Sequence, residues 1–144
     1  MEPITYRPYR PDDISAVRDI LEADLGYSVP REVLAGRIDR MLARGGYTIL
    51  VACDGERVVG FVGAVTFLAF EIEGEAAKVI ALAVSGAYRR RGIGAGLLNA
   101  VETQCREVGI TVILVNSGLP RTDAHAFYES QGYRKKSCGF TKNI

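Results

Sequence analysis

The sequence predicts an α/β fold in which one layer of sheet carries helices on its faces. Two observations predict it. Segments with helical spacing of apolar residues alternate with short strand-like runs along the 144 residues, and no repeat, linker or low-complexity tract interrupts them. Hydrophobic residues make up 48% of the chain, enough for one core without a metal or a disulfide. We therefore expect a single domain spanning residues 1–144.

The first third predicts one strand and two helices. A strand is expected over Ile4–Tyr9, followed by a turn and helix N-cap at Pro11–Asp13. Apolar residues then recur at helical spacing over Ile14–Asp24. Pro30 is well placed to open a second helix, which the pair Gly45–Gly46 ends.

The middle third is rich in strand signals. Tyr47–Cys53 and Arg57–Ala69 read as two strands joined by a hairpin turn at Asp54-Gly55. After a second turn at Glu71–Glu75, the nearly uninterrupted apolar run Ala77–Val84 predicts a central strand covered on both faces.

The last third alternates again. We predict a helix over Gly92–Val108, a buried strand over Thr111–Val115, a short helix over Thr122–Ser130 and a last strand over Gly132–Phe140. The resulting order is β-α-α-β-β-β-α-β-α-β.

Composition narrows the function classes. The net charge of +1 argues against binding nucleic acid through the overall field. The longest nearly uncharged stretch, Val58–Phe70, is too short to cross a bilayer, and Met1–Arg10 lacks the apolar run of a signal peptide. The three cysteines are widely separated and without CxxC spacing, so neither a metal site nor a disulfide framework follows. We expect a cytoplasmic protein with no membrane partner.

The segment from Val84 to Leu98 carries the chemistry. A buried strand leads into a turn with three consecutive arginines and two nearby glycines, Gly92 and Gly94, and the turn opens a helix. Unpaired N–H groups and the partial positive charge of a helix N-terminus together bind phosphate. Glycine lets the backbone approach an oxyanion without interference from a Cβ atom. The direct inference is a turn that binds a diphosphate.

Three other interpretations compete with this one. A dinucleotide-binding turn requires GxGxxG, but Leu97 stands at its last glycine, and no βαβ unit is dedicated to the turn. A Walker A turn requires Gly-Lys-Ser/Thr, which is absent here. A plain loop with surface arginines stays open, although the flanking strand and long helix weaken it.

Two motifs resemble one family. Arg89-x-x-Gly92-x-Gly94 looks like the acetyl-CoA signature of the GCN5-related N-acetyltransferase (GNAT) superfamily. Asn116 followed by Ala124-His-Ala-Phe-Tyr-Glu-Ser-Gln-Gly-Tyr133 resembles its second signature. The resemblance extends from residue 3 to about residue 140. It implies a mixed sheet of six or seven strands with four helices, splayed between the fourth and fifth strands.

The resemblance also implies acetyl-CoA as the acyl donor and assigns site residues. Backbone N–H groups of the turn hold the pyrophosphate, and the end of the preceding strand pairs with the pantetheine arm. Asn116 contacts the cofactor, and Tyr128 lies near the sulfur, where it can protonate the leaving thiolate. The implied turn and strand residues are Leu82, Ala83, Val84, Arg89, Arg90, Arg91, Gly92, Ile93, Gly94, Ala95 and Gly96.

The proton acceptor is not evident. Amine attack on a thioester needs positioning and a donor for the oxyanion, here a backbone N–H near Val84. The amine must also arrive neutral, which requires a base or a water chain. Many family members carry a glutamate on the fourth strand, whereas this sequence has Ile80 and Ala81. A carboxylate base on that strand is therefore doubtful.

Weaker candidates surround this set. His125 is the single histidine and lies three residues before Tyr128, at a spacing that can share a helix face, but a structural histidine is the commoner case. Other residues that could border the acceptor site are Tyr27, Phe67, Phe70, Glu71 and Glu73.

The leading hypothesis is acetyl transfer to a primary amine of a small molecule or a protein. The missing strand carboxylate keeps open an acetyl-CoA sensor or interaction module without turnover. A nucleotide-dependent oxidoreductase is a third reading, from which NAD(P)H binding would follow. Family members often dimerise, so the resemblance is compatible with a homodimer.

Overall fold

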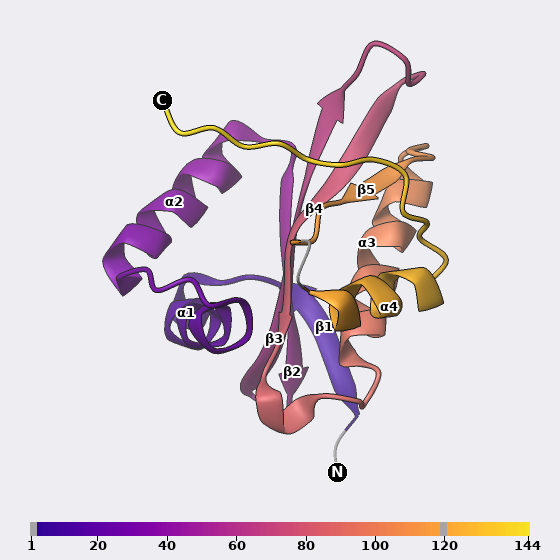
Figure 1. Ribbon diagram of the computed structural model, residues 1–144. Helices are drawn as coiled ribbons and strands as arrows, with labels where there is room; N and C mark the ends of the chain where they lie inside the picture. The colour runs from indigo at the N-terminus through magenta and orange to yellow at the C-terminus, as the bar shows by residue number, and fades with distance from the viewer. Residues whose placement is uncertain (1–2, 119–120) are drawn as a thin grey trace. The chain divides into compact units, whose positions relative to one another are not determined.

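The computed structural model describes residues 3–118 and 121–144 (Figure 1). Its backbone contacts divide the chain into two compact units, Met1–Leu114 and Val115–Ile144. The described residues form one five-stranded sheet in the order β1-β2-β3-β4-β5. Its strands are β1 (Ile4–Pro8), β2 (Tyr47–Asp54), β3 (Arg57–Leu68), β4 (Glu75–Val84) and β5 (Ile113–Val115).

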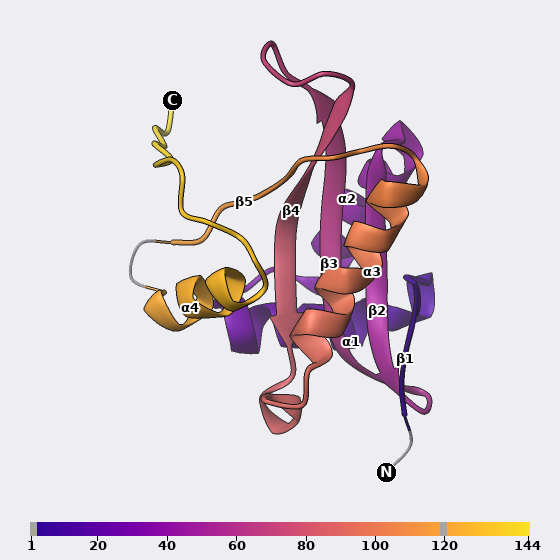
Figure 2. The ribbon, with the colours of Figure 1, turned by 90° about the vertical axis from the view of Figure 1, so that its right-hand side faces the viewer.

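Two helices cover one face of this sheet and a third covers the other (Figures 1 and 2). On the first face, α1 (Ile14–Ile20) and α2 (Arg31–Arg44) pack on a core of strand residues. On the second face lies α3 (Ile93–Glu107), whose inner stripe is almost fully buried. That stripe consists of Ile93, Leu97, Leu98, Val101 and Cys105. Apolar residues that recur every 3.6 positions form one stripe along a helix, and alternate residues of a strand share one face of the sheet. The apolar pattern therefore fixes which side of each helix is buried against the sheet.

Strands β1 to β4 pair antiparallel, with two register shifts. Between β2 and β3, Ala52 pairs with Gly60 and Cys53 with Val58, which leaves one extra residue in β3. Between β3 and β4, Gly63 pairs with Ala81 and Ala64 with Val79, so Ile80 is the extra residue of a β-bulge in β4. The bulge lies four residues before the end of β4, the strand that leads into the Arg89–Gly96 turn.

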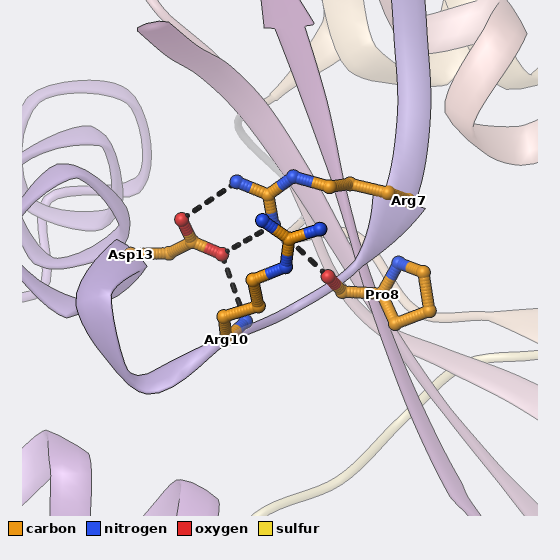
Figure 3. Close-up of polar contacts among 4 residues, drawn as sticks. All are labelled: Arg7, Pro8, Arg10 and Asp13. Carbon is orange, nitrogen blue, oxygen red and sulfur yellow. Dashed lines mark hydrogen bonds and ion pairs between the residues drawn. The ribbon is translucent and has the colours of Figure 1, made fainter. Parts of the chain in front are cut away.

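An ion pair between Arg7 and Asp13 connects β1 to the turn that precedes α1 (Figure 3). Arg7 on β1 donates to both carboxylate oxygens of Asp13, at 2.7 and 2.9 Å, and the N–H of Arg10 donates to Asp13 Oδ2 at 2.8 Å. These hydrogen bonds, that from Arg7 above all, lower the pKa of Asp13. The segment Pro11–Asp13 was expected to supply the N-cap of the first helix, and Asp13 occupies that position. Its side chain makes no capping bond to α1, because it turns back to Arg7 and Arg10.

Two predictions about strands are wrong. The described residues hold five strands rather than six or seven. Residues 132–140, expected as a last strand, join no ladder in the described structure. A strand exists only where a neighbouring backbone accepts and donates its hydrogen bonds, and the Arg134-Lys-Lys sequence has no apolar alternation that would hold one against a sheet.

Candidate functional site

The Arg/Gly turn connects β4 to α3 through a sharply bent backbone. After Val84 the chain makes a short 3-10 turn, η3 (Gly86–Tyr88), and α3 begins at Ile93. Arg90 and Gly92 both lie in the left-handed region, with φ of 62° and 76°. Arg90 is the one non-glycine residue with positive φ among those described. Such a conformation is costly for a residue with a Cβ and is concentrated at functional sites.

The N-terminus of α3 is open. Its N-cap is Gly92, which has no side chain to cap the helix, and a Cβ built there would meet nothing within 4 Å. The first intrahelical bond of this turn runs from the N–H of Gly96 to the carbonyl of Gly92. The N–H groups of Ile93, Gly94 and Ala95 therefore have no helical acceptor and point out of the helix end. This donor set fits a pyrophosphate.

Tyr88 holds the turn against the β2–β3 hairpin. Its hydroxyl donates to Asp54 Oδ2 at 2.8 Å, and this hydrogen bond is the main reason that the pKa of Tyr88 is raised. The guanidinium groups of Arg91 and Arg57 lie 4.9 and 5.7 Å from the centre of its ring. Both distances are within range of cation–π attraction. Arg91 is thus oriented by the aromatic ring that precedes it.

Asp24 connects the turn to the end of β4. It lies in η2 (Leu21–Leu25), one turn of π-helix that continues α1 and ends at Gly26 with φ of 79°. Its carboxylate accepts a hydrogen bond from Arg89 Nη2 at 2.5 Å and one from the backbone N–H of Val84 at 3.1 Å. The expected oxyanion donor therefore points at a carboxylate oxygen. Sequence reasoning missed Asp24, because an acidic residue at a helix end normally indicates a solvated surface.

At the end of β4, Leu82 and Val84 direct backbone groups to the outer edge, whereas Ala83 directs its side chain into the core. The N–H of Ser85 donates to the carbonyl of Val59 in β3, so the N–H of Val84 points to the opposite edge of the strand. Leu82, two residues earlier, has its backbone groups on that same edge. The side chain of Ala83 is buried in the core under α1 and α2.

Ile80 occupies the bulge. Its side chain is 42% exposed and lies beside Gly63 of β3, where an added Cβ would meet Ile80 Cγ1 at 3.4 Å. Ala81 packs against the core under α1 and α2. The surface offered at this point of β4 is therefore apolar.

Gly96 has a packing role that the sequence did not indicate. A Cβ at this position would overlap the hydroxyl end of Tyr6 on β1. The glycine thus lets the first strand approach the first turn of α3. Burial raises the pKa of the Tyr6 hydroxyl.

The second compact unit contains the other predicted site residues. The helix α4 spans Thr122–Ser130, as expected, and Asn116 directly follows β5. Within the unit, the Tyr128 ring makes edge contacts with Phe127 and Tyr133 at 5.3 and 6.0 Å between centroids. His125 Nε2 lies 2.9 Å from the carbonyl oxygen of Gly118, within the same unit.

The weaker acceptor-site candidates are mostly exposed. Tyr27 follows η2 and Phe70 lies at the tip of the β3–β4 hairpin, with Glu71 and Glu73 beside it, and all four are exposed. Phe67 is half-buried.

Neither a metal site nor a membrane-spanning helix is found in the part of the chain that the structure describes. No cluster of histidine, cysteine and carboxylate side chains there could hold a metal ion. Of the helices described, none is long and apolar enough to span a membrane.

A model of the acetyltransferase (GNAT) family matches residues 14–133. The chain belongs to the GNAT acetyltransferase family. Among curated relatives, the GNAT chain is 26% identical over 150 residues to aminoalkylphosphonate N-acetyltransferase of Salmonella typhimurium, a match covering 94% of this chain and 97% of that protein.

A second curated relative and a solved structure are also similar to this chain. N-acetyltransferase 8 of Homo sapiens is 29% identical over 99 residues, which cover 69% of this chain and 44% of that protein. Among solved structures, a transcriptional regulator from Bacillus halodurans C-125 superposes with a TM-score of 0.90 at 22% identity, over 99% of this chain and 100% of that one. At this level of identity, the last likeness shows a shared fold.

Proposed function

We propose that this GNAT chain transfers the acetyl group of acetyl-CoA to a primary amine, by direct attack of the amine on the thioester while both substrates are bound. The observation that carries the proposal is the uncapped N-terminus of α3, with Arg90 and Gly92 in left-handed conformations and three arginines beside it. Family membership supports acetyl transfer in general.

The chain's residues would bind the donor in two places. N–H groups from Arg90 to Ala95 hold the pyrophosphate, and Arg89 to Arg91 add positive charge. The outer edge of β4 from Leu82 to Val84 pairs with the pantetheine arm as an added strand would. We also propose that the sheet opens between β4 and β5 to admit this arm. Asn116 contacts the cofactor from the second unit.

Catalysis would depend on position and on two proton donors. Acetyl-CoA supplies an activated acyl group. The N–H of Val84 donates to the thioester oxygen as negative charge develops on it. Tyr128 donates a proton to the sulfur as the carbon–sulfur bond breaks. The apolar surface at Ile80 and Ala81 supplies no base on β4.

The acceptor class is a primary amine of a small molecule or a protein. The Salmonella relative, by its name, acts on aminoalkylphosphonates, which supports testing small anionic amines first. Residues that could border the acceptor lie after η2 and at the β3–β4 tip, Tyr27 and Phe70 among them. A cytoplasmic location and a homodimer stay predictions.

The proposal is tested by the release of free coenzyme A thiol from acetyl-CoA across a panel of amines. The panel contains 2-aminoethylphosphonate, an aminoglycoside, a polyamine and a lysine peptide. We expect amine-dependent release with at least one class. Saturable acetyl-CoA binding without transfer to any amine would instead favour a sensor, and binding of NAD(P)H in place of acetyl-CoA would exclude the family activity for this chain.

Tyr128→Phe tests the acid. Because the variant keeps the ring and loses only the hydroxyl, turnover should fall by about 10²-fold or more while the affinity for acetyl-CoA stays within about twofold. Initial rates and titration calorimetry measure the two quantities. Tyr133→Phe, which removes the hydroxyl of the adjacent ring, is the matched control. An unchanged rate in Tyr128→Phe would remove the acid role.

A further inference from the structure

Asp24 is the one carboxylate that the described structure places in contact with the end of β4. It reaches the N–H of Val84 at 3.1 Å across 60 positions of sequence, and its side chain is 16% exposed. The turn that carries it is π-helical, a local irregularity that is frequent at functional sites. The contact joins this turn to a distant strand and is not one of the hydrogen bonds within the helix.

The position of this carboxylate matches the position of the developing charge. If the Val84 N–H donates to the thioester oxygen, the Oδ2 atom of Asp24 now lies where that oxygen belongs. The two oxygens cannot share one N–H at full strength. Binding of the donor must therefore move Asp24 off Val84. The carboxylate then lies beside the acyl carbon that the amine attacks.

Arg89 provides the means for this displacement. It pairs with Asp24 at 2.5 Å and is more than half exposed at the start of the pyrophosphate turn. A pyrophosphate on the α3 N-terminus competes with Asp24 for the same guanidinium. Cofactor binding would thus loosen Asp24 at the moment when the thioester oxygen needs the N–H of Val84.

The geometry points to Asp24 as the group that accepts the proton of the incoming amine, a role that rests on the proposed function. The carboxylate takes one proton from the ammonium and later releases it to solvent. The neutral nitrogen then forms the carbon–nitrogen bond, and the sulfur leaves with the electron pair of the broken carbon–sulfur bond. The nitrogen loses a second proton as the amide forms, and this proton replaces the one that Tyr128 gives to the sulfur. The products are the amide, the free thiol and one proton.

Among the described residues, the ion pair found for Asp24 is the one with Arg89. Arg89 faces it from the turn, and Arg18 and Glu22 on its own helix pair with each other at 3.0 Å. Leu82, Ala83 and Val84, which end β4, carry no ionisable side chain. No second carboxylate in contact with Val84 is found among the described residues of the first unit.

The test compares Asp24→Asn with Glu22→Gln, a control that removes the same charge from a residue two positions away. At neutral pH, Asp24→Asn should lower amine-dependent turnover by about 10²-fold or more. The deficit should narrow as the pH rises, because the amine then arrives neutral from solution. The affinity of Asp24→Asn for acetyl-CoA should equal or exceed that of the wild type. Any gain should be larger for acetyl-CoA than for coenzyme A, which lacks the thioester oxygen. Glu22→Gln should resemble the wild type in both measurements.

The outcomes separate the two proposals. A wild-type chain that neither binds acetyl-CoA nor releases thiol contradicts the proposed function. An active wild type with an equally active Asp24→Asn contradicts the role of Asp24. So does loss of acetyl-CoA binding in the variant, which would make Asp24 a support of the turn. Asp24→Glu, which keeps a carboxylate at this position, should recover part of the turnover that Asp24→Asn loses. A folded Asp24→Glu variant that is no more active than Asp24→Asn would also contradict the role.

Discussion

At the scale of single residues, Asp13 shows how one buried carboxylate sets the start of the fold. It accepts three hydrogen bonds from Arg7 and Arg10 and joins β1 to the first helical turn (Figure 3). Its side chain is 7% exposed. A carboxylate that is satisfied in this way stays ionised in the folded protein, so the contribution to stability depends on pH.

Asp13→Asn should therefore lower the free energy of unfolding at pH 7 by about 1.5–3 kcal/mol, the range for hydrogen bonds to charged groups. Because the folded pKa of Asp13 is depressed, this stabilisation is present above the unfolded value of about 3.9 and is lost as the pH falls through the folded value. Urea unfolding at pH 7 and at pH 3 measures it. A difference between wild type and variant that grew on acidification would contradict the ion pair.

Gly96 gives a second test at this scale. Gly96→Ala should destabilise the protein by about 1–3 kcal/mol, because the new methyl group must push Tyr6 aside. In a Tyr6→Ala background the same change should instead stabilise by up to about 1 kcal/mol, since alanine is the better helix former. Thermal unfolding of the four proteins measures the reversal. Equal effects in both backgrounds would show that Tyr6 and Gly96 do not compete for space.

At the scale of elements, the β4–α3 turn owes its shape to its neighbours. Tyr88 binds Asp54 of the β2–β3 hairpin, and Asp24 of η2 binds Arg89 and Val84. Two residues of the turn, Tyr88 and Arg89, are thus held by partners far away in sequence. A positively charged loop without such anchors would spend binding energy on ordering itself.

Tyr88→Phe tests the anchor. Removing a hydrogen bond worth about 0.5–1.5 kcal/mol should weaken acetyl-CoA binding by up to about tenfold, while the ring stays in place for Arg91. Titration calorimetry measures the affinity. Tyr47→Phe, on β2 away from the turn, serves as the control and should bind as the wild type does. An unchanged affinity in Tyr88→Phe would mean that the turn holds its shape without Asp54.

At the scale of the whole molecule, periodicity predicted the elements that have strong patterns. The helices α2, α3 and α4 and the strands β1 to β4 lie within a few residues of their expected bounds. The last strand was wrong, because the Gly132–Phe140 pattern is weak and pairing depends on a distant neighbour. The π-turn at the end of the first helix was not predicted either, because its apolar spacing continues that of α1.

Part of the candidate site was predictable from the sequence and part was not. The turn is encoded locally by its arginines and glycines, and the structure supports an open helix N-terminus there. Asp24, Asp54 and Tyr6 were not predictable, because each acts through a contact with a residue dozens of positions away. The predicted residues belong to two compact units: the turn to the first, Asn116 and Tyr128 to the second.

A titration of the 15N-labelled chain with acetyl-CoA, followed through its backbone amide signals, tests the central claim most directly. Saturable shifts are expected at Val84, across Arg90–Ala95, and in the second unit at Asn116 and Tyr128. Saturable binding that left the amides of Gly92, Gly94 and Ala95 unmoved, or no binding at all, would contradict the account.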